Sequence, residues 1–157
     1  GTPGRVAELW RDLFSGPDPP GAPEFPTLSH ADPAAGLVMA RGLRFHSMCA
    51  HNLLPFFGRA HVDYLPGVRL AGLGDLARVV DYFSRRPTLQ EFIAADVAEY
   101  IDENLKPRGV AVLLEGRHLC MEMRGQKREA IVESSAYRGV FQDPDPRREF
   151  LQRLRRR

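Results

Sequence analysis

Cysteine is scarce in this sequence: Cys49 and Cys120 are the only two among 157 residues. Two thiols cannot form the disulfide framework on which small secreted domains depend. In a reducing compartment such a pair more often binds a metal, takes part in catalysis or is simply buried. Long apolar runs are also missing, which excludes a membrane-spanning helix. The first residues, GTPGRVAELW, lack the apolar core of a secretory signal, so we expect a cytoplasmic protein with no membrane partner.

An excess of charge of one sign is also missing, since 22 Lys and Arg residues against 20 Asp and Glu residues leave a formal net charge of +2. The arginines gather in the tail RREFLQRLRRR. In a terminal helix Phe150, Leu151 and Leu154 would face inward, and late arginines would suit the negative end of the helix dipole. This interpretation is favoured over a nucleic-acid-binding arm. We therefore assign no nucleic-acid partner.

The order of periodic patterns predicts one α+β domain. Residues 5–14 predict a helix, and the stretch SGPDPPGAPEFP predicts an extended connection. We therefore expect residues 1–35 to form a helix and a proline-rich connection, and residues 36–157 to form the main domain. Within it we expect two strands, two amphipathic helices, further strands that include HLCMEM, and a last helix. The second amphipathic helix would place its apolar residues on one face: Leu89, Phe92, Ile93, Val97, Ile101 and Leu105. This order is typical of an antiparallel sheet with helices on one side.

Two details of that pattern can be tested directly. Thr88 followed by Glu91 predicts a capping box at the start of the second amphipathic helix. A sheet of about four strands has open edges, and such edges favour pairing between subunits. We therefore expect a homo-oligomer.

Each cysteine lies two residues from a histidine: Cys49 precedes His51, and Cys120 follows His118. If both segments are extended, the two members of each pair lie on one face of a strand. Thiolate and imidazole are preferred zinc ligands, and a catalytic zinc keeps three protein ligands and one open position. The spacing leaves a second interpretation open, in which the thiols are buried and the histidines are hydrogen-bonded in the core.

The segment SMCAHNLLPFFGRAHVDYLP resembles the zinc segment of GTP cyclohydrolase I, which reads Ser-x-Cys-Glu-His-His before an apolar-Pro-Phe run. The segments TPGRVAELW, GLGDLARVVDYFSRRPTLQE, HLCMEMRG and GVFQDPDPRREFL extend the resemblance in the family's order. It implies that residues 36–157 are a catalytic domain with the tunnelling fold, whose subunit sheets join into a barrel, usually in a decamer. It also implies zinc-assisted hydrolysis at C8 of GTP, release of formate and formation of dihydroneopterin triphosphate.

The resemblance assigns roles to single residues as well. It implies two zinc ligands, two catalytic histidines, a pair that reads the guanine edge and two phosphate-binding arginines. Cys49 and Cys120 match the zinc ligands, and His51 and His118 match the catalytic histidines. Gln90 and Glu91 match the pair that reads the guanine edge, and Arg78 and Arg124 match the phosphate-binding arginines.

Two positions depart from the family pattern. The third zinc ligand of the family is a histidine, and here that position is Asn52, preceded by Ala50 in place of a glutamate. An amide oxygen is a poor zinc ligand, so we expect the third ligand to be either Asn52 or His46. Asp75 stands where the family has a phosphate-binding lysine. It predicts weaker triphosphate binding, although an acid here would also cap a helix.

From these departures we interpret the chain as a divergent cyclohydrolase that opens the ring of a guanine-type or related small heterocycle lacking a triphosphate. Water activated by zinc or by His118 would attack the ring carbon, and His51 would protonate the departing nitrogen. Two alternatives remain: an ordinary GTP cyclohydrolase I, and an inactive relative with a structural or regulatory role.

Overall fold

A computed structural model of the protein describes residues 1–15, 24, 28–29, 36–124 and 127–155. Its main sheet has the strand order β5-β2-β3-β6-β7. The four long strands are antiparallel to their neighbours: β2 (Val38–Cys49), β3 (Pro55–Leu65), β6 (Gly109–His118) and β7 (Ile131–Gly139). The short β5 (Pro87–Thr88) pairs in parallel with the end of β2. A separate two-stranded sheet pairs β1 (Leu28–Ser29) with β4 (Arg69–Leu70).

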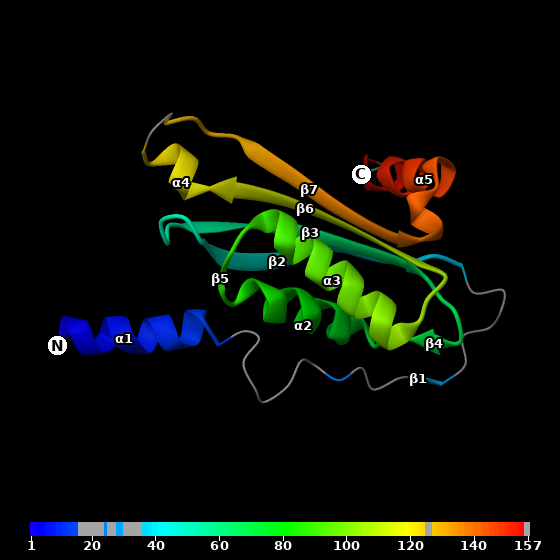
Figure 1. Ribbon diagram of the computed structural model, residues 1–157, viewed down its shortest axis with the longest axis horizontal. Helices are drawn as coiled ribbons and strands as arrows, with labels where there is room; N and C mark the ends of the chain where they lie inside the picture. Colours follow the sequence, from blue (N-terminus) through cyan, green and yellow to red (C-terminus); the bar gives the residue numbers. More distant parts are fainter. Residues whose placement is uncertain (16–23, 25–27, 30–35, 125–126, 156–157) are drawn as a thin grey trace.

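Helices α2 (Leu73–Ser84) and α3 (Gln90–Leu105) cover one face of the main sheet (Figure 1). Side chains alternate along β6, so Val110, Val112 and Leu114 join the core beneath these helices. Ala111 points the other way, where it packs with Phe141 and with Phe150 of α5 (Pro144–Arg155). The prediction of an α+β fold with the two amphipathic helices on one side is confirmed, while the C-terminal helix covers part of the opposite face.

Three shorter or peripheral helices complete the described chain. Helix α1 (Thr2–Leu13) extends away from the sheet and has no buried residue (Figure 1). Helix α4 (Leu119–Glu122) follows β6 directly, and the 3-10 helix η1 (Val140–Gln142) links β7 to α5. Within the described part of the chain, none of the helices has the length and apolar character that a membrane span requires. Most of the predicted proline-rich connection, residues 16–23 and 25–26, lies outside the described residues.

Three local predictions were wrong. HLCMEM is not a strand, because β6 ends at His118 and α4 begins at the next residue. Thr88 does not cap α3: it belongs to β5, and Leu89 takes the N-cap position without a side-chain hydrogen bond. Phe92, which the helical period places on the buried face, is 57% exposed.

Gly58 in β3 should be intolerant of any side chain. A Cβ atom at this position would lie 1.8 Å from the carbonyl oxygen of Glu115 and 2.8 Å from the Cα atom of Gly116, both on the neighbouring strand. Because backbone atoms of a paired strand cannot move aside, we expect Gly58→Ala to lower the free energy of unfolding by about 1–3 kcal/mol. Urea denaturation at a fixed protein concentration measures this loss.

Gly74 in α2 provides the matched control. Apart from its chain neighbours and the backbone of its own helix, no atom of the described residues would lie within 4 Å of a Cβ atom at this position. Gly74→Ala should therefore leave packing intact and raise stability by roughly 0.5–1 kcal/mol, because alanine loses less backbone entropy in a helix. A Gly58→Ala protein as stable as the wild type would contradict the β3–β6 geometry.

Candidate active site

A pocket of about 470 Å³ opens where the ends of β2 and β6 meet the beginning of α3. Its lining includes six of the residues singled out from the sequence: Cys49, His51, Gln90, Glu91, His118 and Cys120. The strand pairing explains how distant segments meet. Cys49 lies beside Thr88 in the parallel β2–β5 pair, which delivers the start of α3, and His118 lies opposite Phe56 in the β3–β6 pair.

A tight turn after β2 fixes the first thiol. The backbone N–H of Cys49 donates to the Leu54 carbonyl at 2.9 Å, and the N–H of Leu53 donates back to the Cys49 carbonyl at 2.8 Å. Leu53 has φ of 55°, a left-handed conformation that is uncommon for a residue with a side chain. The turn leaves Cys49 4% exposed, with its Sγ 3.8 Å from Nδ1 of His51. An extended segment from Cys49 to His51 was therefore the wrong premise, although the two side chains do lie together.

The second thiol reaches the same point from α4. Burial and a hydrogen bond with the Cys49 thiol raise the pKa of Cys120, and the positive charge of Arg124 partly opposes this. The two sulfur atoms are thus neighbours. An extended segment from Gly116 to Met123 was likewise the wrong premise, because the turn of α4, and not strand alternation, carries Cys120 to the pocket.

Two contacts hold the ring of His118 in the pocket. Its ring stacks on Phe56 with a centroid distance of 4.7 Å and an interplanar angle of 4°. Its Nε2 lies 3.0 Å from Oε1 of Gln90. Burial lowers the pKa of His118, against the opposing effect of the Glu91 and Glu122 carboxylates. A lowered pKa keeps the imidazole neutral at pH 7, so the ring can accept a proton there.

The zinc ligands of the family are only partly matched. Two adjacent thiols suit zinc, but the described residues contain no group of three or more His, Cys, Asp or Glu side chains able to hold a metal ion. The Oδ1 of Asn52 accepts the Leu54 N–H at 3.2 Å, so it is engaged within its own turn. The residues present therefore fit two of the three zinc ligands that the family uses.

His46 lies elsewhere. Strand alternation places it on the sheet face opposite Cys49, where it stacks on Phe57 at 6.0 Å and lines a separate pocket with Arg44 and Arg59. The structure does not bring His46 to the thiols.

The predicted phosphate-binding residues lie outside the pocket lining that the described chain provides. Asp75 is 3% exposed, accepts the N–H of Gly72 at 3.1 Å and forms an ion pair with Arg78. The expectation that Asp75 caps a helix is confirmed, because its carboxylate, at the third position of α2, accepts the backbone N–H of the N-cap residue Gly72. Arg78 remains 61% exposed, and Arg124 is exposed after α4.

Sequence reasoning missed the residues that surround Gln90. Gln90 is only 1% exposed, and its amide contacts Val132 and Ser134 of β7. These two residues lie in the stretch QKREAIVESSAY, where the family resemblance is weakest, so no motif pointed to them. Phe56, which supports His118, does lie in a recognisable position, the apolar-Pro-Phe run after the first thiol.

Comparison with known proteins agrees with this arrangement. A family model described as GTP cyclohydrolase I matches residues 1–155. The chain belongs to the GTP cyclohydrolase I family. It is 46% identical over 152 residues to GTP cyclohydrolase 1 of Deinococcus radiodurans, covering 96% of this chain and 70% of the relative. It is 44% identical over 161 residues to GTP cyclohydrolase 1 of Bacillus subtilis, covering 99% of this chain and 83% of the relative. The predicted family and its cyclohydrolase class are confirmed.

Among solved structures, the chain resembles the apo form of the archaeosine synthase QueF-Like, with a TM-score of 0.55 and 22% identity over 68% of this chain and 96% of that one. At this identity the likeness concerns the fold alone, and it agrees with the tunnelling fold. The relatives named GTP cyclohydrolase 1 support the ordinary cyclohydrolase alternative better than the divergent interpretation that the sequence departures favoured.

Proposed function

We propose that this member of the GTP cyclohydrolase I family hydrolyses the imidazole ring of GTP at C8, releasing formate and forming dihydroneopterin triphosphate. The observation that carries the proposal is the meeting of His51, His118 and two thiols in a single pocket with Glu91 at its rim. The family match over residues 1–155 supports the same reaction. Formate release per GTP consumed is the assay that tests it.

In this proposal the two histidines divide the proton transfers. His118, kept neutral by burial, takes a proton from the attacking water as the oxygen adds to C8. His51, at the exposed side of the pocket, protonates the ring nitrogen that departs. Glu91 is exposed at the first turn of α3, and its carboxylate suits the adjacent N–H donors of a guanine edge.

We further propose that Cys49 and Cys120 bind zinc. Zinc, when bound, supplies a Lewis acid that the protein side chains cannot provide. The support is the contact between the two thiols and the closeness of the Cys49 sulfur to His51. The third ligand stays open, because Asn52 is engaged by its own turn and His46 lies on the other face.

A second candidate function is favoured by a specific observation: the Asp75–Arg78 ion pair. A buried carboxylate beside the arginine that would meet a phosphate partly neutralises it. The second candidate is therefore the divergent cyclohydrolase, which acts on a guanine-type ring without a triphosphate. Turnover of GTP, GMP, guanosine and guanine, compared at one enzyme concentration, separates the two candidates.

Replacing Asp75 by asparagine should strengthen GTP binding. Asparagine keeps an oxygen for the Gly72 N–H but removes the negative charge beside Arg78. A like charge at about 4 Å costs roughly 4 kcal/mol at an effective dielectric of about 20. Solvent around the exposed Arg78 screens most of this, so we expect about a tenfold lower KM for GTP, equivalent to about 1.4 kcal/mol.

Guanosine provides the internal control, since it carries no phosphate and its KM should not change in the Asp75→Asn protein. Asp81→Asn, which removes a carboxylate paired with Arg85 farther along α2, is the matched variant. An equal change in KM for GTP and for guanosine in the Asp75→Asn protein would argue against a phosphate site beside Asp75.

We also propose a homo-oligomer, a decamer if the family assembly is kept. Strand β7 is an edge strand of the main sheet, and an open edge favours pairing with a strand of another subunit. Helix α1 exposes Val6 and Leu9, at 42% and 54%. Native mass spectrometry would test the subunit number.

A further inference from the structure

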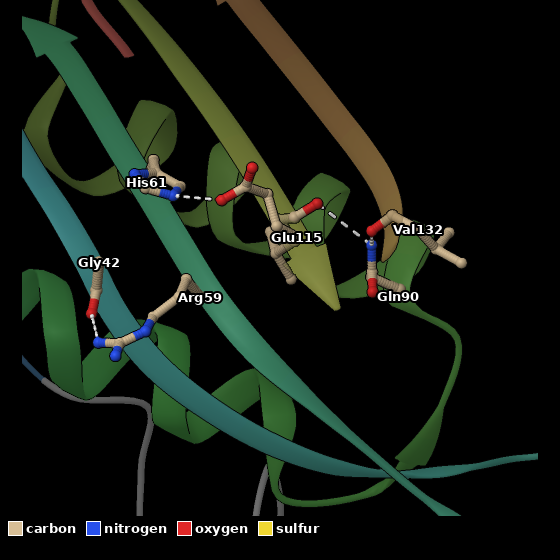
Figure 2. A network of polar contacts seen from close by, with 7 residues as sticks. Gly42, Arg59, His61, Gln90, Glu115 and Val132 are labelled. Carbon is tan, nitrogen blue, oxygen red and sulfur yellow. Dashed lines mark hydrogen bonds and ion pairs between the residues drawn. The ribbon is translucent and has the colours of Figure 1, made fainter. Parts of the chain in front are cut away.

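The amide of Gln90 can be oriented from its neighbours alone. Its Nε2 lies 3.2 Å from the Leu114 carbonyl oxygen and 2.9 Å from the Val132 carbonyl oxygen. Figure 2 shows the amide nitrogen turned toward Val132. Carbonyl oxygens only accept hydrogen bonds, so the NH₂ group must face them. Oε1 must then face the other way, toward the ring of His118.

That orientation decides where His118 carries its hydrogen. Oε1 of Gln90 lies 3.0 Å from Nε2 of His118, and an amide oxygen can only accept. The neutral ring must therefore donate from Nε2, which leaves the lone pair on Nδ1. The stacking on Phe56 holds the ring plane, so two contacts fix both the orientation and the tautomer of the imidazole.

Gly116 of β6 leaves the space that the Gln90 amide occupies. A Cβ atom on Gly116 would lie 2.2 Å from Oε1 of Gln90 and 3.4 Å from the ring of Phe45. Only a residue without a side chain at this point of β6 lets the amide pass between α3 and the sheet. The result is an amide with 1% exposure, whose nitrogen is engaged by β6 and β7 and whose oxygen faces His118.

We propose that Gln90 is a positioning residue, which holds His118 as the Nε2–H tautomer with Nδ1 free to accept a proton, and that it does not read the guanine ring. Glu91, the exposed neighbour at the pocket, is then the one member of the pair available to the substrate. The catalytic use of Nδ1 rests on the proposed function, whereas the tautomer does not.

Solid-state ¹⁵N NMR of histidine-labelled protein tests the tautomer whatever the subunit number. A His118→Asn sample identifies the His118 signals. In the wild type we expect a protonated Nε2 and an unprotonated Nδ1 at a pH where the ring is neutral. Gln90→Leu should shift the Nε2 signal because its acceptor is lost. Gln90→Glu should keep it, because a buried protonated carboxyl can donate from its O–H to the Val132 carbonyl oxygen while its other oxygen accepts from His118. A wild-type His118 protonated on Nδ1 would overturn the inference, even if Gln90→Leu fails to fold.

Kinetics distinguish positioning from substrate reading. Gln90→Leu should lower kcat by roughly 10- to 100-fold, the usual effect of removing a partner that orients a functional histidine, with KM changed less than about twofold. Gln90→Glu should recover most of kcat. A large rise in KM at unchanged kcat would instead make Gln90 a substrate contact and overturn the inference. If no substrate is turned over while the NMR result holds, the proposed function fails and the tautomer assignment stands.

Discussion

Replacing Asn52 by histidine should raise the zinc affinity of the protein by about 100-fold. In the proposed zinc site Cys49 and Cys120 are two ligands, and a histidine at position 52 would restore the third ligand that the family resemblance implies. Structural zinc sites bind with about 10–16 kcal/mol shared among four ligands, so one ligand contributes about 3 kcal/mol, or roughly 100-fold. Competition with a chelating dye, at one pH for both proteins, measures the change.

Two alanine variants serve as controls for this prediction. Asn52→Ala should leave zinc affinity unchanged, because the Asn52 oxygen is engaged by the Leu54 N–H. His46→Ala should do the same, because His46 lies at a separate pocket. A large loss of zinc from either variant would identify that residue as the missing ligand, and an unchanged affinity in Asn52→His would show that the turn cannot present a ligand.

Asp63 should make the protein less stable as the pH rises. Its side chain is fully buried on the sheet face that α5 covers in part, and neither carboxyl oxygen has a hydrogen-bond partner of ordinary geometry among the described residues. Burial raises the pKa of Asp63 from 3.8 to about 7. Three groups oppose this, Arg153 most strongly, then the Tyr64 backbone and Arg41, while Glu149 adds to it.

The sign of the effect follows from proton binding. Between about pH 4 and pH 7 the folded protein keeps a proton on Asp63 that the unfolded chain has lost, so the free energy of unfolding falls as the pH rises. With pKa values of 3.8 and about 7, the loss is about 4 kcal/mol in total, of which roughly 3 kcal/mol falls between pH 5 and pH 8.

Asp63→Asn removes this dependence. We expect the variant to gain stability over the wild type steadily from pH 5 to pH 8, measured by urea unfolding at a fixed protein concentration. Glu133→Gln, a change at an exposed acid on β7, should follow the wild type at every pH. Parallel curves for Asp63→Asn and the wild type would show that Asp63 is ionised in the folded protein at pH 5.

The sequence predicted the fold well because each long element has a clear period. The apolar positions of α3 recur every three or four residues, and Ile93, Val97 and Ile101 are indeed buried. Local periodicity could not reveal α4, because four residues are too few to show a helical pattern. The capping-box motif placed the N-cap of α3 wrongly, since the pairing of Thr88 with Cys49 outweighs the capping preference of threonine.

The site was predictable at the level of residue types and less so at the level of geometry. The family resemblance named Cys49, Cys120, His51 and His118, and the structure brings them together. It could not show that Gln90 is buried, because that depends on Gly116 and on two β7 residues outside any motif. Nor could it show that Asp75 pairs with Arg78, because the family has a lysine at that position.

The most direct test of the central claim is formate release from GTP by the zinc-supplied wild type and by His118→Asn. The pocket chemistry predicts one formate for each GTP consumed by the wild type, and at least about a 100-fold slower release by the variant, because the proton acceptor is gone. Equal rates for the two proteins, or no formate from the wild type, would contradict it.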